Sequence, residues 1–120
     1  MRLAAAITRE LAASHVDVTR ASLGDHALPL YDGDAEYRSG VPREAVSLKR
    51  LISLQHGVVF VSPEYNASVS PLLKNTIDWI GRAHDRGEER GEVFRNRAFA
   101  IASASTKTLG GVHEIGRAHV

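Results

Sequence analysis

The feature that most constrains this chain is an uninterrupted apolar run, Val58–Val61, of three valines and a phenylalanine. β-Branched and aromatic residues favour strands, and a run without polar alternation is typical of a parallel strand covered by helices on both faces. Ser62-Pro63 ends the run, because proline cannot donate a hydrogen bond to a neighbouring strand. The sequence therefore predicts a central parallel strand here.

Two amphipathic segments flank this strand and have the spacing of helices. Pro42 suits the first turn of the earlier helix, which we expect to end near residues 55–57. Ser70 is a good N-cap for the later helix, with Pro71 at its tolerant first position. The first helix has the inward stripe Ala45, Leu48, Leu51 and Ile52, with Arg43, Lys49 and Arg50 outside it, and the second has Leu72, Leu73, Ile77 and Ile80.

The rest of the chain continues this alternation. Leu3, Ala4, Ile7 and Leu11 have helical spacing from the first residues, with no N-cap before them. The remaining segments are a short strand at Val16–Ala21, an irregular loop at Leu23–Gly40, a charged connection at Arg82–Asn96 and a buried strand at Ala98–Ala102. Strands that alternate with helices imply right-handed crossovers and a doubly wound parallel sheet, the α/β class, with helices on both faces.

Composition excludes several functions. A chain of 120 residues holds one domain, and its net charge of +1 lacks the basic face that binding nucleic acid requires. The absence of cysteine fits a reducing compartment, so we expect a cytoplasmic protein. Apolar runs are too short to cross a membrane, and Glu10 interrupts the segment where a signal peptide would be apolar. The six histidines lack the close spacing of metal ligands, so no metal site is expected.

Ligands of open α/β sheets bind beyond the carboxyl ends of the strands, where two loops qualify. One is Ser62–Ser68, and the other runs from Ser103–Ser105 to Gly110-Gly111. The first loop offers free amides, polar side chains and the ring of Tyr65, which suit the polar edge and face of a planar heterocycle. From the residues alone, an ordinary strand-to-helix turn is the commoner explanation of this loop.

A longer motif favours a ligand-binding loop over an ordinary turn. Pro63-Glu64-Tyr65-Asn66, then Ser68, Leu73-Lys74-Asn75 and Ile77-Asp78-Trp79, resembles the signature of NAD(P)H-dependent FMN reductases. The similarity covers nearly all of residues 1–113, which we interpret as a partial flavodoxin-like FMN reductase domain. The resemblance implies that FMN is the cofactor, NAD(P)H the electron donor and a quinone, azo, nitro or similar compound the acceptor. It implies a cofactor site made of Pro63, Glu64, Tyr65, Asn66, Ser103, Ala104 and Ser105.

The resemblance also guides the interpretation of the helix after this loop. Flavin carries the chemistry in such enzymes, so we assign no catalytic residue of the chain. Lys74, Asn75 and Asp78 lie in the helix and are expected to be structural. In relatives this helix contributes to a dimer interface, so the resemblance implies a homo-oligomer with Trp79 as a candidate anchor.

The chain departs from the family pattern at both ends. Relatives begin with a strand and a phosphate-binding loop, which in the order 2-1-3-4-5 would lie between Val16–Ala21 and Val58–Val61. We expect the flavodoxin-like sheet to be incomplete, lacking this first strand and the C-terminal elements, and residues 114–120 to be a non-native tail. Thr106-Lys107 replaces a common Pro-Gly in the second loop. Two alternatives to an enzyme stay open: a non-catalytic flavodoxin-like electron carrier and an inactive fragment.

Overall fold

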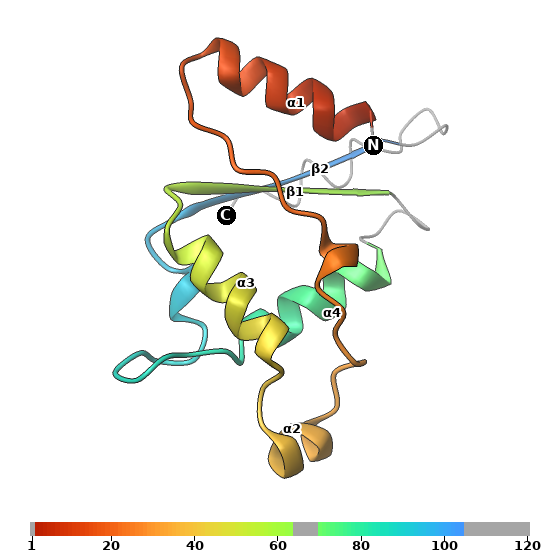
Figure 1. Ribbon diagram of the computed structural model, residues 1–120, viewed down its shortest axis with the longest axis vertical. Coiled ribbons are helices and arrows are strands. Elements are labelled where there is room, and N and C mark those ends of the chain that lie inside the picture. Colours follow the sequence, from red (N-terminus) through yellow and green to blue (C-terminus); the bar gives the residue numbers. More distant parts are fainter. Residues whose placement is uncertain (1, 64–69, 105–120) are drawn as a thin grey trace.

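Two parallel strands, β1 (Gly57–Pro63) and β2 (Ala98–Ala104), form the centre of the fold. The computed structural model describes residues 2–63 and 70–104, and Figure 1 shows the two strands side by side. Their register pairs Gly57 with Ala98 at one end and Pro63 with Ala104 at the other. The structure thus confirms the predicted strands at 58–61 and 98–102 and their parallel direction.

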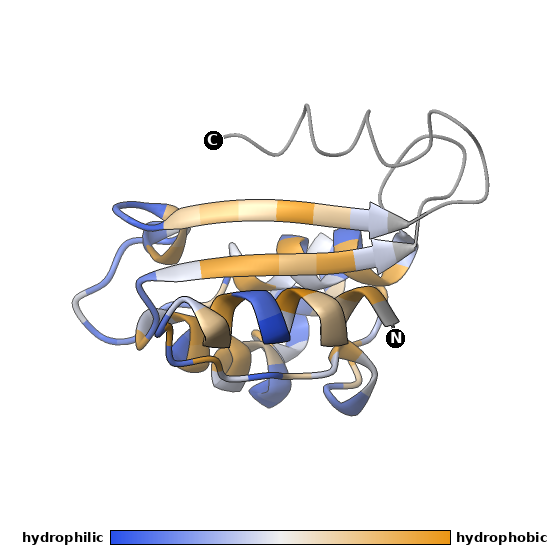
Figure 2. Ribbon diagram, turned by 90° about the horizontal axis from the view of Figure 1, so that it is seen from above, coloured by the Kyte–Doolittle hydropathy of each residue, from blue (hydrophilic) through white to orange (hydrophobic). Residues whose placement is uncertain are grey.

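Helices lie on both sides of the strand pair, as predicted for this α/β fold. In Figure 1, α1 (Arg2–Ala13) lies on one side, and α3 (Arg43–Ser53) and α4 (Pro71–Ile80) lie on the other. Figure 2, which views the molecule from the α1 side, shows that α1 runs alongside β1 instead of covering both strands. None of these helices, within the part of the chain that the structure describes, is long and apolar enough to cross a membrane.

The hydrophobic core lies between the strands and the α3–α4 layer. Leu48, Ile52, Ile80 and Val93 form the buried cluster, against which Val58, Phe94 and Phe99 pack. On the strands, the rings of Phe60 and Phe99 stack with their centroids 5.9 Å apart. Val59 is 40% exposed, so the prediction that this strand is covered on both faces is wrong. The cause is the position of α1, which stands beside β1 and leaves part of that face open.

The predicted strand at Val16–Ala21 is also wrong as an element of the described structure. The segment runs from the end of α1 past β1 towards α4 without joining a sheet (Figure 1). Alternation of apolar and polar residues gives a segment a preference for extended backbone, but a strand exists only where a neighbour completes its hydrogen-bond ladder. Within residues 2–63 and 70–104, no such neighbour lies beside this segment.

The loop predicted at Leu23–Gly40 contains two short helices. A single 3₁₀ turn covers Leu23–Asp25, and α2 covers Gly33–Ser39. The side chain of Asp32 caps α2 by accepting a hydrogen bond from the amide of Asp34 at 3.0 Å. Because α2 buries none of its residues, it lacks the apolar stripe by which a helix is recognised in a sequence.

Helix α4 begins where the sequence predicts, but its buried residues differ in part from the predicted ones. The Ser70 hydroxyl accepts a hydrogen bond from the amide of Leu73 at 3.2 Å, which confirms the predicted N-cap. Leu73 and Ile80 are buried as predicted, but Leu72 is half-exposed. Thr76 and Trp79 are buried in addition, because a further segment of the chain packs against this side of α4.

That segment is the loop before α2, which α4 holds through polar contacts. The Asn75 side chain accepts a hydrogen bond from the amide of Tyr31 at 2.8 Å and donates one to the carbonyl of Pro29 at 3.0 Å. The indole of Trp79 donates to the same carbonyl at 2.7 Å and meets the ring of Tyr31 edge-on. Asn75 is therefore structural, as predicted. Trp79 is 1% exposed, so its predicted role as an interface anchor is wrong.

A second set of contacts fixes α2 to the end of α4. The Glu36 carboxylate accepts hydrogen bonds from Tyr31 at 2.8 Å and from the Arg82 guanidinium at 2.9 and 3.0 Å. Burial raises the pKa of Glu36, but the two hydrogen-bond donors outweigh it and leave this pKa lowered. The bond to Glu36 raises the pKa of Tyr31. These ionisable side chains thus contribute to the attachment of α2.

Lys49 was expected outside the stripe of α3, but it is 2% exposed. Its ammonium group donates hydrogen bonds to Asp85 and Glu88, in the connection that precedes β2. Burial lowers the pKa of Lys49, but these two carboxylates outweigh it and leave the pKa raised. Arg50 and then Lys49 hold the pKa of Asp85 well below its usual range. A buried lysine is tolerated because it is paired, which periodicity alone does not reveal.

The contacts of Asn75 predict a specific loss of stability. Asn75→Ala leaves the Tyr31 amide and the Pro29 carbonyl without this partner, so we expect the free energy of unfolding to fall by about 1–3 kcal/mol. Urea denaturation followed by the fluorescence of Trp79, the only tryptophan, measures this change. Lys74→Ala is the control, because it removes only an exposed ion pair with Asp78, worth about 0.3–0.5 kcal/mol. Equal effects of the two substitutions would contradict the role of Asn75.

Candidate functional site

The two predicted ligand loops leave the sheet at the same edge. Ser62 pairs with Ser103 and Pro63 with Ala104, so β1 and β2 end at the same level. Figure 1 shows both carboxyl ends at one side of the molecule, near the start of α1. Adjacent carboxyl ends are the usual place for a ligand in an open α/β sheet. The register therefore brings together the first residues of both predicted loops.

Only part of the predicted site can be located. Pro63 and Ala104 are the last residues of their strands, and Ser103 lies within β2. Four predicted site residues lie outside the described residues: Glu64, Tyr65, Asn66 and Ser105. The proposed tail at 114–120 lies outside them as well. The assignment of these residues to a cofactor site therefore stays a prediction.

Two buried serines brace the first loop at its ends. The Ser62 hydroxyl donates to the Ser70 hydroxyl over 3.0 Å and accepts from the Ser70 amide over 3.2 Å. Ser70 in turn caps α4 through the amide of Leu73. These bonds join the end of β1 to the start of α4 across the intervening loop. The cap at Ser70 was predicted from the sequence and the role of Ser62 was not, although a serine directly after a buried apolar run signals a polar partner nearby.

Ser103, opposite Ser62 in the register, differs in its hydrogen bonding. Its hydroxyl oxygen is buried and has no hydrogen-bond partner within residues 2–63 and 70–104. A buried hydroxyl without a partner costs about 1–3 kcal/mol, so such groups are uncommon and call for an explanation. A polar ligand at the carboxyl edge of β2 would supply that partner. Ser103 therefore fits a group with a polar rim, such as the ring system of FMN.

The edge otherwise lacks acid–base chemistry in the part of the chain that the structure describes. The side chains with shifted pKa values belong to α2 and the loop before it, to α3 and to the connection from Arg82 to Arg95. No group of three or more histidine, aspartate or glutamate side chains within residues 2–63 and 70–104 could hold a metal ion. What the described residues offer at this edge is hydrogen bonds that can position a ligand.

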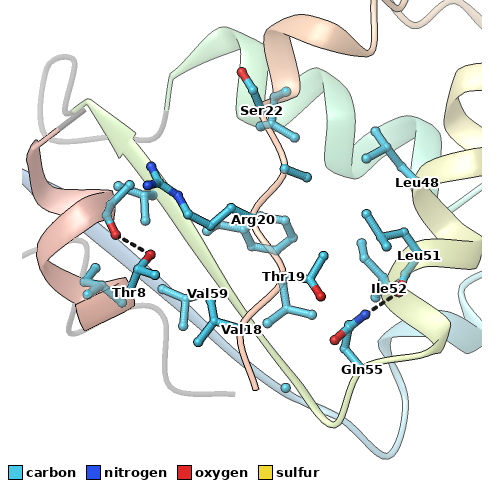
Figure 3. Close-up of a pocket in the computed structure, with 18 of the residues that line it drawn as sticks. Thr8, Val18, Thr19, Arg20, Ser22, Leu48, Leu51, Ile52, Gln55 and Val59 are labelled. Atoms are coloured by element: carbon cyan, nitrogen blue, oxygen red, sulfur yellow. Dashed lines mark hydrogen bonds between the residues drawn. The ribbon is translucent and has the colours of Figure 1, made fainter. Parts of the chain in front are cut away.

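A larger hollow lies on the other side of β1. It has a volume of about 500 Å³ and is lined by α1, the segment 16–24, α3 and β1. Figure 3 shows Leu48, Leu51 and Ile52 of α3 on one wall of the hollow, and Val18 and Val59 are among its other lining residues. Ser103 is not among its lining residues, but Val61 near the end of β1 and Ser70 at the start of α4 are. The hollow therefore reaches the two residues that flank the start and end of the first ligand loop on the β1 side.

Comparison with known proteins identifies the family. The model of the family described as NADPH-dependent FMN reductase matches residues 1–115. The chain belongs to this family. The resemblance that the Pro63–Asn66 motif indicated is thereby confirmed, and the flavodoxin-like fold class agrees with it.

The curated relatives of this chain include quinone reductases. A quinone reductase of Escherichia coli (strain K12) is 46% identical over 84 residues, which are 70% of this chain and 42% of that protein. A 2-hydroxy-1,4-benzoquinone reductase of a Burkholderia species is 36% identical over 80 residues, covering 64% of this chain and 43% of that protein. The chain thus spans less than half the length of these relatives.

A solved structure agrees with the family assignment. FerB, a flavoenzyme NAD(P)H:(acceptor) oxidoreductase from Paracoccus denitrificans, superimposes with a TM-score of 0.67 at 26% sequence identity. The superposition covers 91% of this chain and 55% of FerB. The order of helices and parallel strands in this FMN reductase chain is therefore that of a known flavoenzyme.

The contrast between the two paired serines is testable by stability. Ser62→Ala removes two hydrogen bonds to Ser70, so we expect the free energy of unfolding to fall by about 1–3 kcal/mol. Ser103→Ala removes a buried hydroxyl without a described partner, so we expect the free energy of unfolding to stay the same or to rise by up to about 1–3 kcal/mol. Urea denaturation of the ligand-free chain measures both. A large loss in Ser103→Ala would assign that hydroxyl a structural bond and remove it from the site.

Proposed function

We propose that the protein containing this chain is an NAD(P)H-dependent oxidoreductase that uses FMN to reduce a small-molecule acceptor, such as a quinone, azo or nitro compound. Family membership and the quinone reductases among the relatives support this function. When bound, FMN would supply the chemistry that carries a hydride, and with it two electrons, from NAD(P)H to the acceptor. A quinone that takes up these electrons with two protons becomes the hydroquinone.

The observation that carries the proposal is the Ser103 hydroxyl at the carboxyl edge of the paired strands, which has no hydrogen-bond partner among the described residues. We infer that this hydroxyl hydrogen-bonds the polar rim of the flavin, next to Ala104 and Ser105. Pro63–Asn66 leaves the same edge and supplies amides and the Tyr65 ring from the other side. In this arrangement the chain binds and orients the flavin, and none of its side chains transfers a proton.

A non-catalytic electron carrier is the competing function. Carriers dock through strongly charged surfaces, and a net charge of +1 does not provide one. The named relatives are reductases, which favours an enzyme. For its location we propose the cytoplasm, since a chain without cysteine needs no oxidising compartment. We expect neither nucleic acid nor a membrane as a partner.

The enzyme proposal predicts coupled flavin binding and turnover. With FMN, the protein containing this chain should oxidise NAD(P)H in the presence of a benzoquinone, measured by the absorbance of the reduced nicotinamide. Tyr65→Ala combined with Asn66→Ala should weaken FMN binding by about 1–3 kcal/mol, roughly 5- to 150-fold, because contacts to the ring are lost. A fluorescence titration of FMN measures the affinity directly.

Two results separate the competing functions. Tight FMN binding with almost no NAD(P)H oxidation would identify a carrier, and no FMN binding at all would identify an inactive fragment. Arg43→Ala is a suitable control, because Arg43 is exposed at the start of α3 and belongs to neither predicted ligand loop. FMN affinity unchanged in the double variant would remove Tyr65 and Asn66 from the site.

We also propose that the protein containing this chain is a homo-oligomer. Trp79 is buried within its own chain, so an interface on α4 would use exposed residues such as Leu72, which is 50% exposed. Light scattering at micromolar concentration should give a mass of at least two chains, and Leu72→Glu should lower it by placing a charge in the contact. A monomeric mass for the unsubstituted protein would contradict the proposal.

A further inference from the structure

Two aromatic side chains that can each give up a single electron lie in contact on one side of α4. Trp79 is the only tryptophan of the chain, and Tyr31 is one of its three tyrosines. Their ring centroids are 4.9 Å apart, and the rings meet edge-on. Indole and phenol rings lose an electron more readily than the phenyl ring of phenylalanine does. At this contact distance an electron can pass directly from one ring to the other.

The hydroxyl of Tyr31 faces a group that can take its proton. It donates a hydrogen bond to the Glu36 carboxylate at 2.8 Å, and the Arg82 guanidinium holds the same carboxylate at 2.9 and 3.0 Å. Burial raises the pKa of Glu36, but the bonds from Tyr31 and Arg82 leave this pKa lowered, so the carboxylate is ionised at neutral pH. A phenol that has lost an electron is a strong acid. Its proton would therefore move to Glu36.

The indole of Trp79 is bonded differently. Its N–H donates to the Pro29 carbonyl at 2.7 Å, and the side chain is 1% exposed. A peptide carbonyl is a far weaker base than a carboxylate, so the indole cannot lose its proton to its partner as the phenol can. Loss of the proton stabilises an oxidised ring. An oxidised Trp79 is therefore expected to draw an electron from Tyr31, and the reverse transfer is disfavoured.

From this geometry we propose that Trp79, Tyr31 and Glu36 form a proton-coupled electron relay, which carries an oxidising equivalent out of the core of the chain. The oxidant is a strong one-electron oxidant, such as a radical derived from oxygen, and it removes one electron from the indole. Tyr31 then returns one electron to the indole, while its O–H bond breaks and the proton forms an O–H bond on Glu36. The step leaves neutral Trp79, a neutral tyrosyl radical and a protonated Glu36. The core tryptophan is thereby restored.

The test forms the oxidised indole inside the full 120-residue chain with a laser pulse. A wavelength that indole absorbs and phenol does not ejects an electron from Trp79, and nitrous oxide with tert-butanol captures that electron. The reference chain carries Tyr37→Phe and Tyr65→Phe, so that Tyr31 is its only tyrosine. Transient absorption follows the tryptophan and tyrosyl radicals, which absorb at different wavelengths. The tyrosyl radical should appear at the rate at which the tryptophan radical disappears.

Two substitutions in the reference chain separate the electron from the proton. Tyr31→Phe keeps a ring against Trp79 but removes the hydroxyl, so the tryptophan radical should persist and no tyrosyl radical should form. Glu36→Gln keeps an oxygen that accepts the hydrogen bond but removes the base. Since a positioned base contributes about 10²–10⁴-fold, the transfer should slow by at least about tenfold. Glu44→Gln is the matched control, because the Glu44 carboxylate contacts His26 and should leave the rate unchanged.

The other outcomes overturn the relay. Equal lifetimes of the tryptophan radical with and without the Tyr31 hydroxyl would exclude transfer between the rings. Equal rates in Glu36→Gln and Glu44→Gln would remove the Glu36 carboxylate from the step. Urea denaturation shows whether each variant is folded. If Glu36→Gln is not, deuterated water decides with the reference chain alone, because a rate unchanged in it would exclude proton transfer in this step. Since no flavin is added, these results are independent of the proposed function.

Discussion

The parallel pairing of β1 with β2 is the constraint on which the remaining structure depends. Seven residues of each strand pair in register, so the loops after Pro63 and Ala104 start at one edge. The same pairing presents Val58 and Phe99 to α3 and α4 and so defines the core. Because the connection between parallel strands must cross over the sheet, α4 is positioned directly after the first loop. The register of β1 and β2 therefore determines both where the two predicted ligand loops begin and which residues form the core.

Polar contacts then attach the loops and connections that do not take part in the sheet. The Ser62–Ser70 bonds join β1 to α4, Asn75 holds the loop before α2, and Lys49 holds the connection before β2. Each joins residues distant in sequence or at opposite ends of a loop and satisfies a group that burial would otherwise leave unpaired. Against this background Ser103 is exceptional, because its buried hydroxyl lacks such a partner among the described residues. That exception is the observation on which the proposed ligand site at this edge rests.

The local sequence pattern was enough to predict the elements that are marked by a continuous apolar run or by a helix cap. The strands at 58–61 and 98–102 and the capped start of α4 followed from the sequence and are present. Burial of Trp79 and Lys49 could not be predicted, because each depends on a partner far away in the chain, the Pro29 carbonyl and the Asp85–Glu88 carboxylates. Of the candidate site, the sequence located the edge and the motif, while the bracing role of Ser62 required the structure.

The segment 16–21 shows most clearly why a strand is not a local property. Its alternation favours extended backbone in the same way as the run in β1, and it lies along the same hollow. β1 is a strand because β2 completes its ladder, whereas the segment 16–21 faces a space with no described strand in it. An isolated extended segment loses conformational entropy without gaining ladder bonds, so its pattern alone cannot stabilise it. Pairing between neighbouring strands organises the centre of this fold. Because no described strand pairs with residues 16–21, the strand predicted there did not form.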